Sequence, residues 1–380
     1  MTIGNAVRRP RLLVTLAVGV LLALAAAGCG GGGAKPIPIG LVTSLTGTEI
    51  GVGKDVARGV ELAIEEVNEA GGIRARQLEL ITEDCKCSAQ VATEAVRKLI
   101  DTDNVPAIVN GTRTDILLEW LEYARSKGVI VLNVAATTAA GEEQTRITNT
   151  VFTLGVPAAA LGQELARWAH GDGHQRIAVL GPDNPFGADF RRAAAEELRR
   201  LGRDAVVSAS YVEGRSDYTA TVNAVAATRP DAIICGLYGD DGKTLVPQAV
   251  AARLSAPWYV PYPSQVTLDN PALGEGRVFG IEVGYNTASA QRFRKRFAAR
   301  FPHARPTAWS AFSHDGIWLL AQAMRQQGEN TKALAAVFIR GAPGYSGASG
   351  RIEFNEQGVR INPLLERLRM TRTGDLVPVE

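Results

Sequence analysis

The chain has 380 residues and a mass of 40.3 kDa, with 46% hydrophobic and 21% charged residues. It is too long for one compact core and too apolar to be disordered, so we expect two folded domains. Its formal charge is +2, but three of the basic residues lie in the first 28, which contain no acidic residue. The near-neutral remainder argues against a nucleic-acid-binding protein, and four cysteines exclude a disulfide-built scaffold.

The first 28 residues have the pattern of a secretory signal peptide. Arg8, Arg9 and Arg11 form a basic segment, and an uncharged apolar run follows at residues 12–27. This run is shorter than the roughly 20 residues that a membrane-spanning helix needs. We therefore expect the chain to be exported.

Small residues directly precede Cys29 and resemble a bacterial lipobox, with Ala26 at a position where leucine is commoner. The resemblance implies that Cys29 is lipidated and becomes the new N-terminus of a membrane-anchored lipoprotein. Residues 29–36 then form a flexible Gly-rich tether, because glycine runs behave as random coil. The alternative is ordinary cleavage nearby and an exported protein without a lipid anchor.

From residue 37 onward, short β-rich apolar runs alternate with amphipathic helical windows. This pattern is typical of parallel strands covered by helices, and it restarts after a turn-rich stretch near Gly141. We therefore expect two successive α/β units of similar size. The expected strands are residues 37–42, 78–82, 107–110, 129–134, 176–180, 205–210, 232–235, 258–260 and 351–354. The expected helices include residues 52–67, 89–100, 116–125, 288–300 and 309–327.

Seven segments carry a likeness to a known family. They are PIGLVTSLTGTEIGVGKDVARGVELA at residues 38–63, EEVNEAGG at 65–72, AVRKLID at 95–101, VAAT at 134–137, AVLGPDNPFG at 178–187, PDAIICGLY at 230–238 and SGRIEFNEQG at 349–358. In this order, and behind a lipobox, they resemble the type I periplasmic solute-binding proteins. The likeness is to the branched-chain amino-acid group of ABC transport receptors in particular.

The resemblance implies an α/β fold with two doubly wound parallel-sheet domains joined by three crossovers. The N-terminal lobe would comprise residues 37–155 plus 285–342, and the C-terminal lobe residues 156–284 plus 343–380. A small solute would close the two lobes like a hinged clamp. Such a receptor is a monomer that delivers its solute to an ABC permease, with no enzymatic activity, no cofactor and no metal.

The residues themselves place a binding site at the carboxyl ends of the strands, where open parallel sheets bind small molecules. In the first unit the loops at residues 44–47, 111–114 and 135–138 are small and hydroxylic, which allows backbone amides to approach an anion. In relatives that bind amino acids, the first lobe holds the carboxylate and aromatic residues of the second lobe close over the solute. The ligand-binding residues that this implies are Arg113, Thr114, Ala135, Ala136, Thr137, Phe186, Tyr238, Asp240 and Tyr262.

Three departures from the family pattern concern the solute. An acid that meets an α-ammonium is expected near residues 261–264, which contain no carboxylate, and Val52 replaces an aromatic residue. Arg113 stands where relatives usually have serine, and its guanidinium can grip a carboxylate with two hydrogen bonds. We therefore expect an organic acid rather than a zwitterion. The alternative is that Arg113 points to solvent and that Asp240 or Asp241 meets an amine.

Two further features concern the state of a cysteine pair and the position of a tryptophan. Cys85 and Cys87 flank Lys86, and they form either a strained disulfide or two thiols. Trp309 lies in an apolar helical stripe and is expected in the core rather than in a ligand site. The main interpretation is a substrate-binding lipoprotein of an ABC importer that captures a small amino acid or an organic carboxylate, aromatic ones included, between two lobes. The alternatives are a ligand sensor that signals to a partner and an exported hydrolase, for which Arg113 or Asp183 would be essential.

Overall fold

The computed structural model describes residues 1–2, 34–47, 50–138, 150–266, 268, 270–271, 277–339 and 345–379. The predicted lipidation site Cys29, nearly all of the predicted signal peptide and the first part of the tether lie outside these residues. Ile37–Glu380 is one compact unit. None of the helices in the described ranges is long and apolar enough to cross a membrane.

Within the described residues, the first sheet has five parallel strands in the order β2-β1-β3-β4-β5. Side chains alternate between its two faces, as strand geometry requires. Ile39 and Leu41 pack into one hydrophobic cluster, whereas Val42 packs into another on the opposite face. The strands are β1 (Ile37–Thr43), β2 (Leu78–Asp84), β3 (Ala107–Gly111), β4 (Ile130–Asn133) and β5 (Val151–Thr153).

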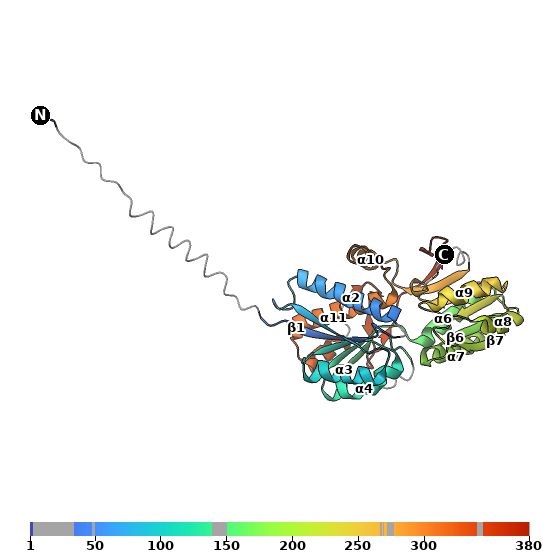
Figure 1. The fold of residues 1–380 in the computed structure, drawn as a ribbon, viewed down its shortest axis with the longest axis horizontal. Coiled ribbons are helices and arrows are strands. Elements are labelled where there is room, and N and C mark those ends of the chain that lie inside the picture. The colour runs from blue at the N-terminus through green and yellow to red at the C-terminus, as the bar shows by residue number, and fades with distance from the viewer. Residues whose placement is uncertain are drawn as a thin grey trace. The chain divides into compact units, whose positions relative to one another are not determined.

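Two pairs of helices cover the faces of this sheet (Figure 1). Helices α2 (Ile50–Glu69) and α11 (Ala308–Gln327) pack together on one face, and α3 (Ala89–Asp101) and α4 (Thr114–Ser126) on the other. The α2–α11 pair is close because Gly59 has no side chain. A Cβ atom there would lie 2.2 Å from the carbonyl oxygen of Ser310.

The second sheet repeats the arrangement of the first. Its parallel strands follow the order β7-β6-β8-β9-β10, and two antiparallel strands, β15 and β16, extend it beyond β10. The strands are β6 (Ile177–Pro182), β7 (Val207–Tyr211), β8 (Ala232–Cys235), β9 (Trp258–Pro261), β10 (Val278–Val283), β15 (Leu365–Met370) and β16 (Leu376–Pro378). The helices of this lobe are α6 (Ala158–Gly171), α7 (Pro185–Arg200), α8 (Thr219–Ala227) and α9 (Asp241–Ala251).

Within the described residues the chain passes between the two sheets at residues 154–157, 284–287 and 362–364. The first two passages adjoin the predicted lobe boundaries, and the third lies downstream of the one predicted after residue 342. The segment before it is held to α11, because the buried carboxylate of Asp315 accepts hydrogen bonds from the backbone N–H groups of Ala348 (2.6 Å) and Ser349 (2.8 Å). Buried Arg360 in turn donates to the Ser349 carbonyl at 2.6 Å and to the Leu154 carbonyl at 3.2 Å.

This segment contains short strands, and the helices α10 (Ala288–Arg300) and α12 (Thr331–Ile339) precede it. The predicted strand at residues 351–354 is wrong in detail, because Ile352 interrupts it and its two halves pair with different partners. The short strands are β11 (Ser346–Gly347), β12 (Gly350–Arg351), β13 (Glu353–Phe354) and β14 (Arg360–Ile361).

The predicted fold class is confirmed: the chain has two α/β lobes, each with a doubly wound parallel sheet. Both sheets have the strand order 2-1-3-4-5, in which the direction of winding reverses between the first and third strands. Ligands bind at this reversal point, outside the carboxyl ends of the strands. Each lobe therefore provides one edge of a sheet at which a ligand can bind.

The predicted alternative of a disulfide between Cys85 and Cys87 does not occur in the described structure. Buried Cys85 lies with its sulfur 3.3 Å from the hydroxyl oxygen of Ser44, and no bond joins it to Cys87 in the described structure. Both Lys86 and Cys87 have positive φ angles, at 54° and 56°.

Candidate functional site

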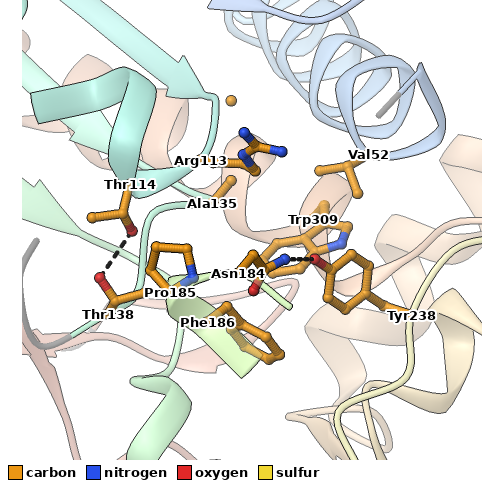
Figure 2. Close-up of a pocket in the computed structure, with 11 residues that line it drawn as sticks. Val52, Arg113, Thr114, Ala135, Thr138, Asn184, Pro185, Phe186, Tyr238 and Trp309 are labelled. Atoms are coloured by element: carbon orange, nitrogen blue, oxygen red, sulfur yellow. Dashed lines mark hydrogen bonds between the residues drawn. The ribbon is translucent and has the colours of Figure 1, made fainter. Parts of the chain in front are cut away.

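A cavity of about 510 Å³, including the open space at its mouth, lies at the carboxyl ends of strands from both sheets. Its walls come from the loops after β3 and β4, from the loops after β6 and β8, and from the first turns of α2 and α11 (Figure 2). The residues that line it are Val52, Gly111, Arg113, Thr114, Ala135, Thr138, Asn184, Pro185, Phe186, Tyr238 and Trp309.

The structure brings five of the nine predicted ligand-binding residues to this cavity: Arg113, Thr114, Ala135, Phe186 and Tyr238. The other four, Ala136, Thr137, Asp240 and Tyr262, are not among the residues that line it. Ala136 and Thr137 are buried behind Ala135, next along the loop after β4. The hydroxyl of Thr137 has no hydrogen-bond partner among the described residues.

The first-lobe wall combines a cation with the start of a helix. Arg113 immediately precedes α4, and its Nε and Nη2 atoms donate to the two carboxylate oxygens of Asp115 at 3.0 and 2.7 Å. These hydrogen bonds lower the pKa of Asp115, so the carboxylate stays ionised. The hydroxyl of Thr114 accepts from that of Thr138 at 3.0 Å, which joins the loops after β3 and β4. An arginine has no acceptor atom with which to cap the amides of α4.

Two buried asparagines support this wall from behind. Asn110, the penultimate residue of β3, is buried and donates to the side-chain oxygen of Asn133, at the end of β4, at 3.0 Å. Asn110 also accepts from the hydroxyl of Thr112 at 2.7 Å, and Asn133 accepts from the backbone N–H of Ala136 at 3.1 Å. These bonds hold both loops in one conformation, because side-chain amides inside a protein must be satisfied.

The second-lobe wall is aromatic, and its polar atoms are already bonded. Phe186 and Tyr238 meet edge to face with ring centroids 5.5 Å apart. The carboxylate of Glu213 accepts from the Tyr238 hydroxyl at 2.7 Å and from the Asn184 amide at 2.7 Å. Asn184 also caps α7 by accepting from the N–H of Gly187 at 2.8 Å, and it donates to the Tyr238 hydroxyl at 3.1 Å (Figure 2). Sequence reasoning missed Glu213, which follows β7 and carries no motif.

The two acids weighed as partners for an amine have other contacts. The side chain of Asp240 is 76% exposed and forms an ion pair with Lys243 at 3.0 Å. Asp241 accepts from the hydroxyl of Tyr218 at 2.7 Å and from the N–H of Gly214 at 2.9 Å. Neither lines the cavity.

Tyr262 lies behind Trp309 rather than at the cavity surface. Its side chain is fully buried, its ring packs against Trp309 with centroids 5.3 Å apart, and its hydroxyl accepts from the N–H of Val156 at 3.3 Å. Burial raises the pKa of Tyr262. Trp309 is buried, as expected of a core residue, but it also lines the cavity, which the sequence did not predict. Helical spacing identifies its buried face, but not that this face reaches a binding site.

Two doubly wound lobes with a cavity at the carboxyl ends of their strands define a two-lobed α/β binding protein. A family model described as "Periplasmic binding protein" matches residues 36–365. The chain therefore belongs to this family, which consists of solute-binding proteins rather than enzymes.

Several relatives are similar over most of their length. An "Amino acid binding protein" of Pseudomonas aeruginosa is 23% identical over 337 residues, which is 85% of this chain and 87% of the relative. "Leu/Ile/Val-binding protein homolog 2" of Brucella abortus is 21% identical and covers 85% of this chain and 87% of its own length. These identities are low, so the family rests on the family model, and the relatives do not establish the solute.

Solved structures of similar proteins share the fold. A leucine-binding protein from Thermotoga maritima has a TM-score of 0.78 and 19% identity, covering 90% of this chain and 98% of its own. A solute-binding protein of an ABC transporter from R. palustris, in complex with benzoate, has a TM-score of 0.79 and 18% identity, covering 90% and 95%.

Proposed function

We propose that the chain is the substrate-binding protein of an ABC importer and captures a small organic carboxylate between its two lobes. One observation carries the choice of solute: among the described residues that line the cavity, Arg113 is the only charged one. A cation beside the uncapped N-terminus of α4 favours an anion, because the first turn of a helix is electropositive. A zwitterion would leave its ammonium group without an acid in the described part of the wall.

The rest of the wall suits the apolar part of such a solute. Phe186, Tyr238 and Trp309 present rings, and Val52 presents a methyl surface where the family pattern has another aromatic residue. A cavity of this kind binds an aromatic or branched aliphatic acid by burying its apolar surface. Two structurally similar proteins support this class, since their structures contain benzoate and 3,4-dihydroxybenzoic acid.

An aliphatic amino acid is the second candidate. The names of the relatives favour it, because they describe proteins that bind amino acids or leucine, isoleucine and valine. In this case Glu213, an acid of the second lobe that is hydrogen-bonded to two residues of the wall, would have to exchange its hydrogen bonds with Tyr238 and Asn184 for one with the ammonium group.

Transport follows from closure of the two lobes. A solute that touches both walls stabilises the closed conformation, and a permease that recognises this conformation receives the solute. A sensor would pass the same closure to a signalling partner. We also propose that the protein is anchored outside the cytoplasmic membrane by a lipid on Cys29, as a monomer.

A ligand panel tests the solute. Residues 35–380 are heated with benzoate, 3,4-dihydroxybenzoate, branched aliphatic acids, leucine, isoleucine and sugars. A solute at about 1,000 times its Kd stabilises the folded state by about 4 kcal/mol, which raises the melting temperature measurably. We expect stabilisation by carboxylates and not by amino acids. Stabilisation by leucine or isoleucine alone contradicts the organic-acid proposal, and turnover of a carboxylate ester would indicate a hydrolase instead.

Fractionation of cells tests the anchor. The full chain is expected in the membrane fraction, and Cys29→Ser is expected in the soluble fraction. Cys85→Ser is the matched control and should stay with membranes. Membrane retention of Cys29→Ser would contradict lipidation.

A further inference from the structure

The indole of Trp309 is held rigidly against the cavity. Trp309 is 4% exposed and lies in the first turn of α11, which begins after Thr307. Thr307 and Ser310 form a reciprocal capping box, and the Thr307 hydroxyl also donates to Asp55 on α2 at 3.0 Å. The ring packs against Tyr262 and Phe312 with centroids 5.3 and 5.9 Å apart. The side chain therefore has one well-defined orientation.

The polar atom of this ring is unused in the described structure. The Trp309 Nε1 atom is buried and has no hydrogen-bond partner among the described residues. An indole N–H can only donate, and buried donors in proteins are almost always bonded. Figure 2 shows the ring among the side chains that line the cavity. Because Nε1 is buried while the ring lines the cavity, a partner for this donor can come from the cavity when solute binding opens the wall beside the ring.

Neighbouring polar groups of the wall have partners within the protein. The hydroxyl of Tyr238 and the amide of Asn184 are bonded to Glu213. The hydroxyls of Thr114 and Thr138 are bonded to each other. A buried donor in such a wall discriminates strongly between solutes, because a solute without an acceptor leaves the donor unsatisfied.

We propose that the Trp309 N–H donates a hydrogen bond to an uncharged oxygen of the solute, and that Trp309 thereby selects carboxylates that carry a keto or ether oxygen. This inference rests on the proposed function. The carboxylate is assigned to Arg113 and the start of α4, on the loop after β3, whereas Trp309 belongs to α11 and packs on Tyr262, beyond β9. The two groups therefore contact different parts of one solute.

Matched pairs of carboxylates test the proposal. In each pair a keto compound is compared with an isosteric isopropyl compound that lacks the acceptor. The pairs are 3-acetylbenzoate with 3-isopropylbenzoate, 4-acetylbenzoate with 4-isopropylbenzoate, and 4-oxopentanoate with 4-methylpentanoate. The Kd of each is measured by calorimetry with the wild-type protein and with Trp309→Phe, which keeps an aromatic ring but removes the donor.

The chain offers a matched control in Trp120. Trp120 also has a buried Nε1 without a partner among the described residues, but its ring lies in the hydrophobic cluster around α3 and α4 and does not line the cavity. For at least one pair, we expect the keto-to-isopropyl affinity ratio to fall about tenfold in Trp309→Phe, which corresponds to about 1.4 kcal/mol. The ratio should be unchanged in Trp120→Phe.

Two results overturn the proposal and can be told apart. Equal ratios in the wild-type protein and in Trp309→Phe, for every pair that binds, would show that the N–H does not contact the solute, while the proposed function stands. Failure of the wild-type protein to bind any carboxylate would overturn the proposed function together with this inference.

A spectroscopic measurement on the wild-type protein gives a second readout. The chain has five tryptophans, so a ¹⁵N-indole spectrum is simple. We expect the Trp309 signal to move downfield with the keto member of a pair and not with the isopropyl member, while the Trp120 signal stays in place. If Trp309→Phe does not fold, phenylalanine variants of the other four tryptophans assign the signal. An unmoved Trp309 signal with every bound keto acid would overturn the proposal.

Discussion

The two walls of the cavity differ in how their polar groups are used. In the first-lobe wall a cation precedes a helix that its side chain does not cap, and small residues leave the backbone accessible. In the second-lobe wall Asn184 caps α7 with its own side chain, and Glu213 binds both Asn184 and Tyr238. The first wall is therefore suited to hold charge, whereas the second presents rings whose polar atoms are already satisfied.

The difference shows that two lobes of the same fold contribute differently to solute binding. Both lobes have the same strand order, so both offer loops at the same edge of the sheet. The residue just before each helix makes the difference. Arg113 before α4 contributes a positive charge, whereas the side-chain oxygen of Asn184 before α7 accepts a hydrogen bond from the N-terminus of that helix. Four substitutions test this comparison.

Replacement of Arg113 should have the largest effect. Arg113→Ala removes the only charged side chain among the described residues of the wall, so affinity for a carboxylate should fall at least tenfold, or about 1.4 kcal/mol. Calorimetry measures the change, and Arg113→Lys should recover part of it as a point charge. Unchanged affinity in Arg113→Ala would place the charge elsewhere and remove the argument for an organic acid.

Replacement of Tyr238 should weaken binding somewhat less. Tyr238→Ala removes a ring from the second wall, and we expect a loss of about five- to tenfold for aromatic acids, because buried aromatic contacts contribute about 0.5–1.5 kcal/mol beyond their area. Tyr238→Phe, which keeps the ring, should lose much less. The melting temperature is the control: unfolding of Tyr238→Ala would make this residue part of the core.

Replacement of Glu213 sharpens the comparison, because it distinguishes the two solute classes. Glu213→Gln keeps the shape of the side chain and one acceptor for Tyr238, so carboxylate binding should change by about threefold or less. Glu196→Gln, on the exposed side of α7, is the control. A selective loss of leucine binding of tenfold or more in Glu213→Gln would instead identify this acid as an ammonium partner.

Replacement of Asp115 should have the smallest effect and the opposite sign. Asp115 competes for the guanidinium of Arg113, so Asp115→Asn should strengthen carboxylate binding by about two- to threefold, as expected for a half-exposed ion pair of less than about 1 kcal/mol. The gain should shrink at high salt. Asp101→Asn, which disrupts the ion pair with Lys127 instead, is the control. Weaker binding in Asp115→Asn would show that Asp115 orients Arg113 rather than competing with the solute.

The sequence by itself determined the architecture and half of the candidate site. Short continuous apolar runs separated by amphipathic helices are typical of parallel strands covered on both faces, and residues such as Arg113 and Tyr238 follow strands whose carboxyl ends lie at one edge of a sheet. The antiparallel strands β15 and β16 escaped prediction, because β15, which lies between β10 and β16, alternates charged residues with Leu368 and Met370 and has no continuous apolar run.

Only the tertiary structure decided which side chains meet. Glu213 reaches Tyr238 and Asn184 from positions 25 and 29 residues away, and Trp309 joins the wall from a helix more than 70 residues beyond Tyr238. Spacing likewise does not tell Ala135, which lines the cavity, from Thr137, which is buried behind it. Local patterns report which face of an element is apolar, but the direction of a loop side chain depends on the packing of segments that are distant in the chain.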